Sequence, residues 1–360
     1  MNDKVRILFV VPSMRGGGSE RFISTLISNI DTSRYDVALV LLKKVGPFLT
    51  DLPRDLTVYD LDVEKARYCV HKIIKIIRKY QPDSVFSTLS YLNLIIGLIR
   101  PFISKDIRFI ARETNTVSVR NKYQPYPRLF DFLYRVVYKN FDNIIAQAEF
   151  MKEDLIKNYQ IDERKISVIN NPVDVAHITL QSLSDVFLYS KNNINLLAVG
   201  SFTEQKGFDT LLKALSRLED KYFLTVLGEG GLENHYKRLA HELGVTARVH
   251  FAGFKRNPYP YMKQADLFIL SSRYEGFPNV VLEANACGTP VVAFDCPGGT
   301  GEIMQDGLNG FLAKCQDVDH LIEKILEASN LGFNSQEITN YIISKYGLQK
   351  IINQYQNVLC

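Results

Sequence analysis

The stretch "SSRYEGFPNVVLEANACGTPVVAFDCPGG", residues 271–299, follows an apolar run typical of a buried strand and contains two glutamates eight residues apart, Glu275 and Glu283. Pro278 suits the first position of a helix, and Gly288 suits its C-cap. Acidic side chains stabilise helix N-termini, but this effect fades beyond the first turn, and Glu283 lies deeper. Capping therefore explains at most one glutamate. The first N–H groups of this helix predict an anion-binding site at the end of a strand.

Around this stretch, short β-branched runs alternate with helical periods, a pattern typical of βαβ units and parallel sheets. The chain of 360 residues exceeds the usual size of one domain, so two are expected. We predict an α/β fold of two doubly wound, Rossmann-like domains, residues 1–172 and 194–344, with a polar linker at 173–193. The C-terminal helix, 345–360, could pack back on the first domain.

The predicted strands are 5–11, 35–42, 56–62, 84–90, 108–113, 143–148 and 166–172 in the first domain, and 194–200, 222–228, 248–253, 267–272 and 290–295 in the second.

Cysteine usage and apolar runs indicate the compartment. Five scattered cysteines without a Cys-x-x-Cys pair argue against a disulfide framework or a zinc site and favour a reducing compartment. The longest apolar run, 92–103, is broken by Arg100 and Pro101 and is too short to span a bilayer. The N-terminal run is typical of a strand, not of a signal peptide. We therefore expect a cytoplasmic protein without a transmembrane segment.

Positive charge is concentrated in the first half of the chain. Residues 65–141 contain 15 Lys and Arg against 4 Asp and Glu, whereas residues 181–360 contain 16 against 19. Such a basic region favours an anionic partner, which could be a nucleic acid, a phosphorylated substrate or a membrane surface.

Glycine-rich turns follow three of the predicted strands. Three glycines at 16–18 let a backbone approach a ligand, although Arg21 breaks the dinucleotide fingerprint and a flexible turn is the alternative. Lys206 precedes a helix in the second domain, where its charge opposes the helix dipole unless an anion is shared; a solvated lysine is the alternative. Glu229 lies in a third such turn. Ligands of open α/β sheets bind at this edge.

The segments "GGGSER", "GSFTEQKG", "GEGGLE" and "EGFPNVVLE" occur in this order, and the last has Glu-x7-Glu spacing. This ordered set resembles family 4 retaining glycosyltransferases, which have the GT-B fold of two Rossmann-like domains facing across a cleft. The resemblance covers most of the chain and implies that the second domain binds a nucleotide-sugar donor.

The resemblance also implies roles for the matching residues. Lys206 would bind the donor diphosphate and Glu275 would contact the transferred sugar, both as catalytic residues, while Glu283 would hold the ribose hydroxyls. The implied donor-binding set is Gly17, Gly18, Ser201, Lys206, Glu229, Gly253, Phe254, Arg256, Arg273, Glu275, Phe277, Pro278, Asn279, Val280 and Glu283.

Ser201 departs from the family pattern, because many members have an arginine there that acts with the lysine. Either Arg273 or Arg256 supplies the second cation, or donor affinity is lower.

No cofactor or metal is expected, because Lys206 and helix N-termini can stabilise a departing diphosphate. The Asp-x-Asp tripeptides at 60–62 and 317–319 are more typical of solvated or capping carboxylates. Glu113, the third catalytic candidate, ends a first-domain strand and is expected to face the acceptor; an edge carboxylate paired with Arg112 is the alternative.

The segment "PRLFDFLYRVVYKNF" places Arg128, Arg135 and Lys139 on one helical stripe that Phe132 and Tyr138 flank. A largely buried helix with one wet edge is one interpretation. The other is a helix on an anionic membrane surface, near a lipid-diphosphate acceptor. No recognised binding module accompanies the charge, so no nucleic-acid partner is expected.

We expect a retaining, metal-independent hexosyltransferase that moves a hexose or N-acetylhexosamine from a nucleotide sugar, with UDP as the expected nucleotide, to a lipid-linked glycan. The process would be bacterial O-antigen or capsule synthesis, and the protein would be peripheral on the inner face of the cytoplasmic membrane. The alternatives are a nucleotide-sugar epimerase of the same fold and a non-catalytic sugar-nucleotide-binding protein.

Overall fold

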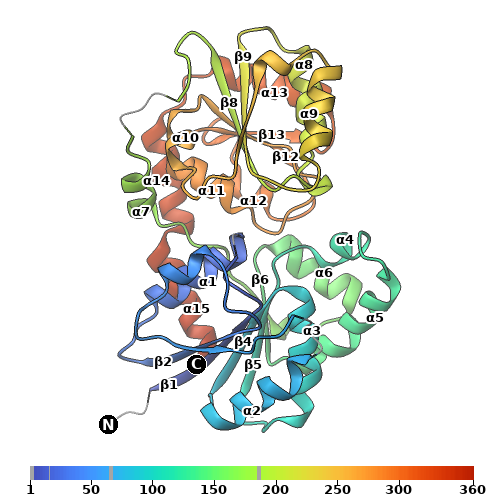
Figure 1. The fold of residues 1–360 in the computed structure, drawn as a ribbon, viewed down its shortest axis with the longest axis vertical. Helices are drawn as coiled ribbons and strands as arrows, with labels where there is room; N and C mark the ends of the chain where they lie inside the picture. The colour runs from blue at the N-terminus through green and yellow to red at the C-terminus, as the bar shows by residue number, and fades with distance from the viewer. Residues whose placement is uncertain (1–3, 16, 65–67, 185–187) are drawn as a thin grey trace. The chain divides into compact units, whose positions relative to one another are not determined.

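A computed structural model describes residues 4–15, 17–64, 68–184 and 188–360. The chain forms two compact units: unit 1 comprises Met1–Pro172 and Gln349–Cys360, and unit 2 comprises Val173–Leu348. Each unit contains one parallel sheet with helices packed around it (Figure 1). The predicted α/β fold of two doubly wound parallel sheets is confirmed.

The sheet of unit 1 has seven strands in the order β3-β2-β1-β4-β5-β6-β7. Its strands are β1 (Val5–Val11), β2 (Tyr35–Leu41), β3 (Thr57–Asp60), β4 (Ser84–Thr88), β5 (Arg108–Arg112), β6 (Asn143–Ala146) and β7 (Ile166–Val168). Its helices are α1 (Gly18–Asn29), α2 (Val70–Tyr80), α3 (Ser90–Ile99), α4 (Val117–Asn121), α5 (Pro127–Val137), α6 (Glu149–Tyr159) and α15 (Leu348–Leu359).

The sheet of unit 2 has six strands in the order β10-β9-β8-β11-β12-β13. Its strands are β8 (Ile194–Val199), β9 (Tyr222–Leu227), β10 (Val249–Gly253), β11 (Leu267–Leu270), β12 (Val291–Asp295) and β13 (Gly310–Lys314). Its helices are α7 (Val175–Gln181), α8 (Phe208–Arg217), α9 (Glu233–Glu242), α10 (Tyr259–Gln264), α11 (Asn279–Ala286), α12 (Thr300–Ile303), α13 (Val318–Asn330) and α14 (Ser335–Tyr346).

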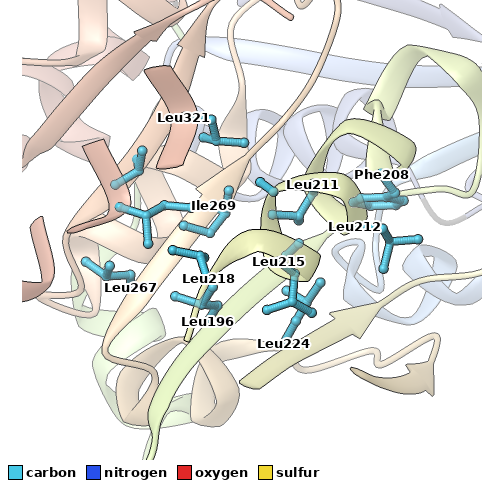
Figure 2. Close-up of a cluster of buried hydrophobic side chains, with 14 of the residues drawn as sticks. Leu196, Phe208, Leu211, Leu212, Leu215, Leu218, Leu224, Leu267, Ile269 and Leu321 are labelled. Carbon is cyan, nitrogen blue, oxygen red and sulfur yellow. The ribbon is translucent and has the colours of Figure 1, made fainter. Parts of the chain in front are cut away.

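The inner strands of both sheets, such as β4 and β11, are buried, which explains why they are continuous apolar runs without alternation. In unit 2, the leucines of α8 pack on strand residues such as Leu196 and Ile269, and Leu321 of α13 belongs to the same core (Figure 2). Burial of this apolar surface holds the strands in register, so the loops that follow them end at one edge of the sheet.

Two segments differ from the sequence prediction. Strand β13, "GFLAK", is absent from the predicted set, because a short run that begins with glycine has little strand signal. The predicted linker at 173–193 contains helix α7, which belongs to unit 2. The Asp174 carboxylate caps this helix by accepting a hydrogen bond from the His177 N–H at 3.0 Å.

The C-terminal helix α15 belongs to unit 1, although it follows unit 2 in the sequence. Tyr355 of α15 is fully buried, and its ring centroid lies 4.9 Å from that of Phe22 on α1. Its hydroxyl accepts a hydrogen bond from Nε of Arg112 at 3.1 Å. The helix is therefore part of the unit 1 core.

We predict that Tyr355→Ala destabilises unit 1 by about 3–5 kcal/mol, because it leaves a cavity and removes the hydrogen-bond partner of a buried arginine. Urea unfolding followed by circular dichroism measures this change. The matched control is Gln354→Ala, on the exposed side of α15, which should change stability by no more than about 0.5 kcal/mol. Equal stability of both variants would show that α15 is not part of the folded core.

Candidate active site

At the carboxyl edge of the unit 2 sheet, backbone hydrogen bonds join the end of β10 to the loop after β9, and the loop after β11 to the loop after β12. The Gly228 N–H, after β9, donates to the Gly253 carbonyl at the end of β10, at 3.0 Å. The Glu275 N–H, after β11, donates to the Pro297 carbonyl, after β12, also at 3.0 Å. This edge is where parallel α/β sheets bind ligands.

Two glycines allow the β8 loop to approach its neighbours. A Cβ atom built on Gly207 would lie 2.2 Å from the Ser271 carbonyl oxygen, and one built on Gly228 would lie 1.9 Å from that of Gly200. Both glycines also have a positive φ, +62° and +145°. Only glycine fits these positions, and their backbones hold the three loops together.

Lys206 and Glu275, both predicted site residues, form an ion pair at this edge. The Lys206 Nζ lies 2.6 Å from Glu275 Oε1, and the two side chains are only 18% and 8% exposed. The Ser272 hydroxyl donates to the same oxygen at 2.6 Å. The aliphatic part of Lys206 lies over Gly200, where a Cβ atom would be 3.2 Å from it. The lysine charge is thus held in one place within a poorly solvated pair.

Helix α11 begins at Asn279 beside this pair. Pro278 is its cap residue, with φ −72° and ψ 103°, and not the first helical residue as predicted. The first N–H groups of the helix have no acceptor within it and can bind an anion. Val280 lies in this first turn, and Glu283 is buried farther along the helix.

Phe277 turns its side chain away from solvent. Its ring is 4% exposed and lies edge-on to Tyr346, with centroids 5.3 Å apart. Only the backbone of Phe277 is therefore suited to ligand contact, and its contact with a donor stays a prediction.

Arg273 is already paired within unit 2. Its guanidinium contacts both oxygens of the Asp209 carboxylate, at 2.8 and 3.0 Å, and also donates to the Glu204 carbonyl. Both terminal nitrogens of its guanidinium therefore already donate within unit 2, so Arg273 is poorly suited to replace the arginine that many members have at the position of Ser201. Arg256 and Ser201 are both exposed.

The remaining predicted donor residues lie in the same strand-end loops or in unit 1. Glu229 and Phe254 are exposed, after β9 and β10. Gly17 caps α1 and Gly18 begins it, whereas Gly16 lies outside the described residues. Their contact with a donor stays a prediction.

Two residues that position the site were missed from the sequence, Ser272 and Asp209. Ser272 lies in the quoted stretch three residues before Glu275, so its spacing was a usable signal. Asp209 is 64 residues from Arg273, and no sequence pattern connects the two.

Glu113, the catalytic candidate of unit 1, is fully buried at the end of β5. Its carboxylate accepts hydrogen bonds from Ser90 Oγ and Asn93 Nδ2, both at 3.0 Å, and from the hydroxyls of Tyr134 and Tyr138. Burial raises the pKa of the Glu113 carboxyl, against the opposing effects of the Arg120 charge and of these donors. Its contact with an acceptor stays a prediction.

The pairing with Arg112 that the alternative interpretation of Glu113 assumed is wrong, because the two side chains have separate partners. Strand β5 lies inside the sheet between β4 and β6, and successive side chains of a strand point to opposite faces. Arg112 donates instead to Tyr355, to Thr88 and to Asn171, the last at 2.6 Å.

The Asp-x-Asp tripeptides act locally. Asp60 accepts the N–H groups of Lys44 and Asp62, and Asp317 caps α13 through the His320 N–H. Across the described ranges, no group of three or more His, Cys, Asp or Glu is arranged as a metal site.

The cationic residues predicted to touch a membrane are exposed on or next to α5. Arg128 and Arg135 lie on the helix, and Lys139 lies in the short 3-10 helix η4 (Tyr138–Asn140) that follows. Phe132 is 60% exposed. Tyr138 is fully buried and does not flank this stripe, because its hydroxyl reaches inward to Glu113. None of the helices within the described residues has the length and apolarity that crossing a bilayer requires.

Two known protein families match successive parts of the chain. The family described as glycosyltransferase family 4 matches residues 16–177, and that described as glycosyl transferases group 1 matches residues 181–345. The chain belongs to glycosyltransferase family 4, and it has the GT-B fold.

Named relatives act in bacterial glycan assembly. The chain is 28% identical over 323 residues, 86% of either chain, to N-acetylgalactosamine-N,N'-diacetylbacillosaminyl-diphospho-undecaprenol 4-alpha-N-acetylgalactosaminyltransferase of Campylobacter jejuni. It is 23% identical to the amylovoran biosynthesis glycosyltransferase AmsD of Erwinia amylovora, over 95% of this chain and 96% of that one. Among solved structures, Anabaena HepE in complex with UDP aligns with TM-score 0.78 at 20% identity and covers 99% of both chains.

We predict that the free energy of unfolding of Glu113→Gln, relative to that of the parent, increases as the pH rises from about 4 to 7. The raised pKa means that the unfolded chain releases the Glu113 proton at lower pH than the folded one, so the parent loses stability with rising pH, and glutamine does not. The matched control is Glu153→Gln on α6. Lys157 lowers the pKa of Glu153, so the parent gains stability as this carboxyl ionises. Glu153→Gln lacks that gain and should become less stable relative to the parent over the same range. Thermal unfolding at several pH values measures both, and parallel curves for parent and Glu113→Gln would contradict the prediction.

Proposed function

We propose that this protein is a retaining glycosyltransferase that moves a hexose or N-acetylhexosamine from a UDP sugar to a lipid-diphosphate-linked glycan during bacterial surface-polysaccharide assembly. The observation that carries this proposal is the Lys206–Glu275 pair, held where the strand-end loops of unit 2 meet the first turn of α11. The nucleotide is supported by the HepE complex with UDP, and the acceptor class by the Campylobacter jejuni relative.

The chemistry follows from the charges at this edge. When the bond between the sugar and the diphosphate breaks, negative charge develops on the leaving phosphate oxygen. The Lys206 ammonium and the N–H groups of α11 would stabilise that charge without a metal. The acceptor hydroxyl attacks the anomeric carbon on the face that the phosphate leaves, and its proton passes to the phosphate, so no separate general base is needed.

The carboxylates would bind the rest of the donor. Glu275 would accept hydrogen bonds from the transferred sugar, and Glu283 would accept them from the ribose hydroxyls. Exposed Phe254, at the end of β10, would contact the base.

The acceptor would keep the protein at the membrane. A lipid-linked glycan is confined to the bilayer, and Arg128, Arg135 and Lys139 form an exposed cationic stripe on unit 1. We propose that these three cations bind the anionic inner face of the cytoplasmic membrane, each contributing about 1 kcal/mol.

A donor panel tests the proposal against both alternatives. Several nucleotide sugars are incubated with a lipid-diphosphate acceptor, and products are read by mass spectrometry. Transfer of one sugar supports the proposal. A changed sugar without acceptor would indicate an epimerase, and binding without turnover would indicate a non-catalytic protein.

We predict that Lys206→Met lowers kcat by about 10²–10³, because its charge stabilises the leaving diphosphate, while KM for the donor changes less. Steady-state kinetics measures both. The matched control is Lys213→Met on the exposed side of α8, which should keep parental kinetics. A kcat within about threefold of the parent would remove Lys206 from the chemistry.

We also predict that activity survives excess EDTA, because the diphosphate is neutralised by the protein itself. Activity that is lost and then rescued by Mg²⁺ or Mn²⁺ would overturn the metal-independent mechanism.

A further inference from the structure

The exposed face of α5 carries an apolar stripe beside the cationic one. Leu129, Phe132 and Val136 are 53%, 60% and 51% exposed, and their i, i+3, i+7 spacing places them on one side of the helix. Arg128 and Arg135 occupy the neighbouring side, again one heptad apart. Side chains of this size are seldom left exposed together unless they bind something.

The neighbours of α5 show how the two stripes are oriented. Arg135 Nε donates to the Asn158 carbonyl of α6 at 3.1 Å, so the cationic stripe borders α6. On the other side α5 packs against α3, where a Cβ atom on Gly97 would lie only 2.4 Å from Cγ1 of Val137. The apolar stripe therefore lies towards α3.

Two more exposed apolar side chains lie at the end of α3, the helix against which α5 packs. Leu98, which follows Gly97, is 52% exposed, and Phe102 in the 3-10 helix η3 (Arg100–Phe102) is 74% exposed. At the other end of α5, its cap residue Tyr126 is 70% exposed. Helix α5 itself lies at the outer edge of unit 1 (Figure 1). We call these six residues the apolar rim: Leu98, Phe102, Tyr126, Leu129, Phe132 and Val136.

The charges on α5 indicate what kind of partner the apolar rim binds. The only acidic residue of α5, Asp131, turns inward, where its carboxylate accepts hydrogen bonds from Tyr159 at 2.7 Å and from Asn121 at 2.9 Å. The exposed face of α5 is therefore purely cationic and apolar. A lipid surface complements both stripes, because its anionic headgroups can bind the cationic side chains and the hydrocarbon beneath them can bind the apolar ones.

We propose that the apolar rim inserts into the headgroup–acyl boundary of an anionic bilayer, with the cationic stripe on the headgroups. This inference rests on the membrane contact of the proposed function and deepens it, because charge alone would leave the protein on the surface. Leu129, Phe132 and Val136 would enter the apolar layer, and Tyr126 would lie at its polar boundary.

The chain offers a direct test, because it contains no tryptophan. The Phe132→Trp variant reports the environment of the rim, and Leu331→Trp, at a 43% exposed position of unit 2, is the matched control. Both are mixed with phosphatidylglycerol vesicles, with or without bromine on the acyl chains. We expect blue-shifted emission and quenching by the brominated chains for Phe132→Trp only.

A second variant measures the contribution of the rim to binding. Leu129→Ser/Phe132→Ser/Val136→Ser should weaken vesicle binding at least about tenfold, whereas Leu331→Ser/Ile343→Ser should not change it. Thermal unfolding checks that both variants are folded. Retained transfer to a water-soluble acceptor by the triple variant would show that the proposed activity stands independently of insertion.

Three results would overturn the inference. Unchanged emission of Phe132→Trp with anionic vesicles would exclude insertion, even if the parent sediments with them through charge. A blue shift that depends on protein concentration without vesicles would show that a second copy of the chain covers the rim. Unaltered vesicle binding by the triple variant would show that the rim contributes nothing.

Discussion

The close approach of backbone to backbone at the carboxyl edge of the unit 2 sheet determines where the charged side chains of the candidate site lie. Gly207 and Gly228 have no room for a side chain, so the β8 loop lies directly against the loops of β9 and β11. This contact places Lys206 within 2.6 Å of Glu275, a residue 69 positions away. The sheet core beneath keeps the loops fixed, because its strands are buried and packed by α8 and α13.

Unit 1 arranges its polar groups differently. At the corresponding edge, Glu113 is enclosed by donors from α3, α5 and η4, so its carboxylate ties the tyrosines of the α5 segment to the sheet. The same helix turns its cationic and apolar side chains outward. The α5 segment therefore packs on the buried polar cluster around Glu113 with one side and presents a cationic and apolar surface to solvent with the other.

The sequence predicted all seven strands of the unit 1 sheet and five of the six strands of the unit 2 sheet, and it indicated that Lys206 and Glu275 follow strands of the same sheet. Strands such as β1 and β8 are long apolar runs, and parallel sheets align their ends, so Lys206 and Glu275 could be placed at one edge. Pairings over long sequence distances could not be predicted. The Asp209–Arg273 pair and the inward turn of Tyr138 depend on how helices pack, and neither leaves a local pattern. Strand β13 was missed because "GFLAK" is too short and glycine-flanked to stand out.

The Lys206–Glu275 pair has a consequence for the order of events in a transfer cycle. Because Glu275 already neutralises Lys206, a diphosphate that binds this ammonium competes with the carboxylate. Glu275 would then lose one of its two hydrogen-bond donors and keep that of Ser272, and a buried carboxylate short of donors is costly. The hydroxyls of an attached sugar would supply those donors, whereas a bare nucleoside diphosphate would not. Under the proposed function, the pair would thus discriminate between fresh and spent donor. It would re-form as the spent nucleotide departs, so the protein would favour release of its own product.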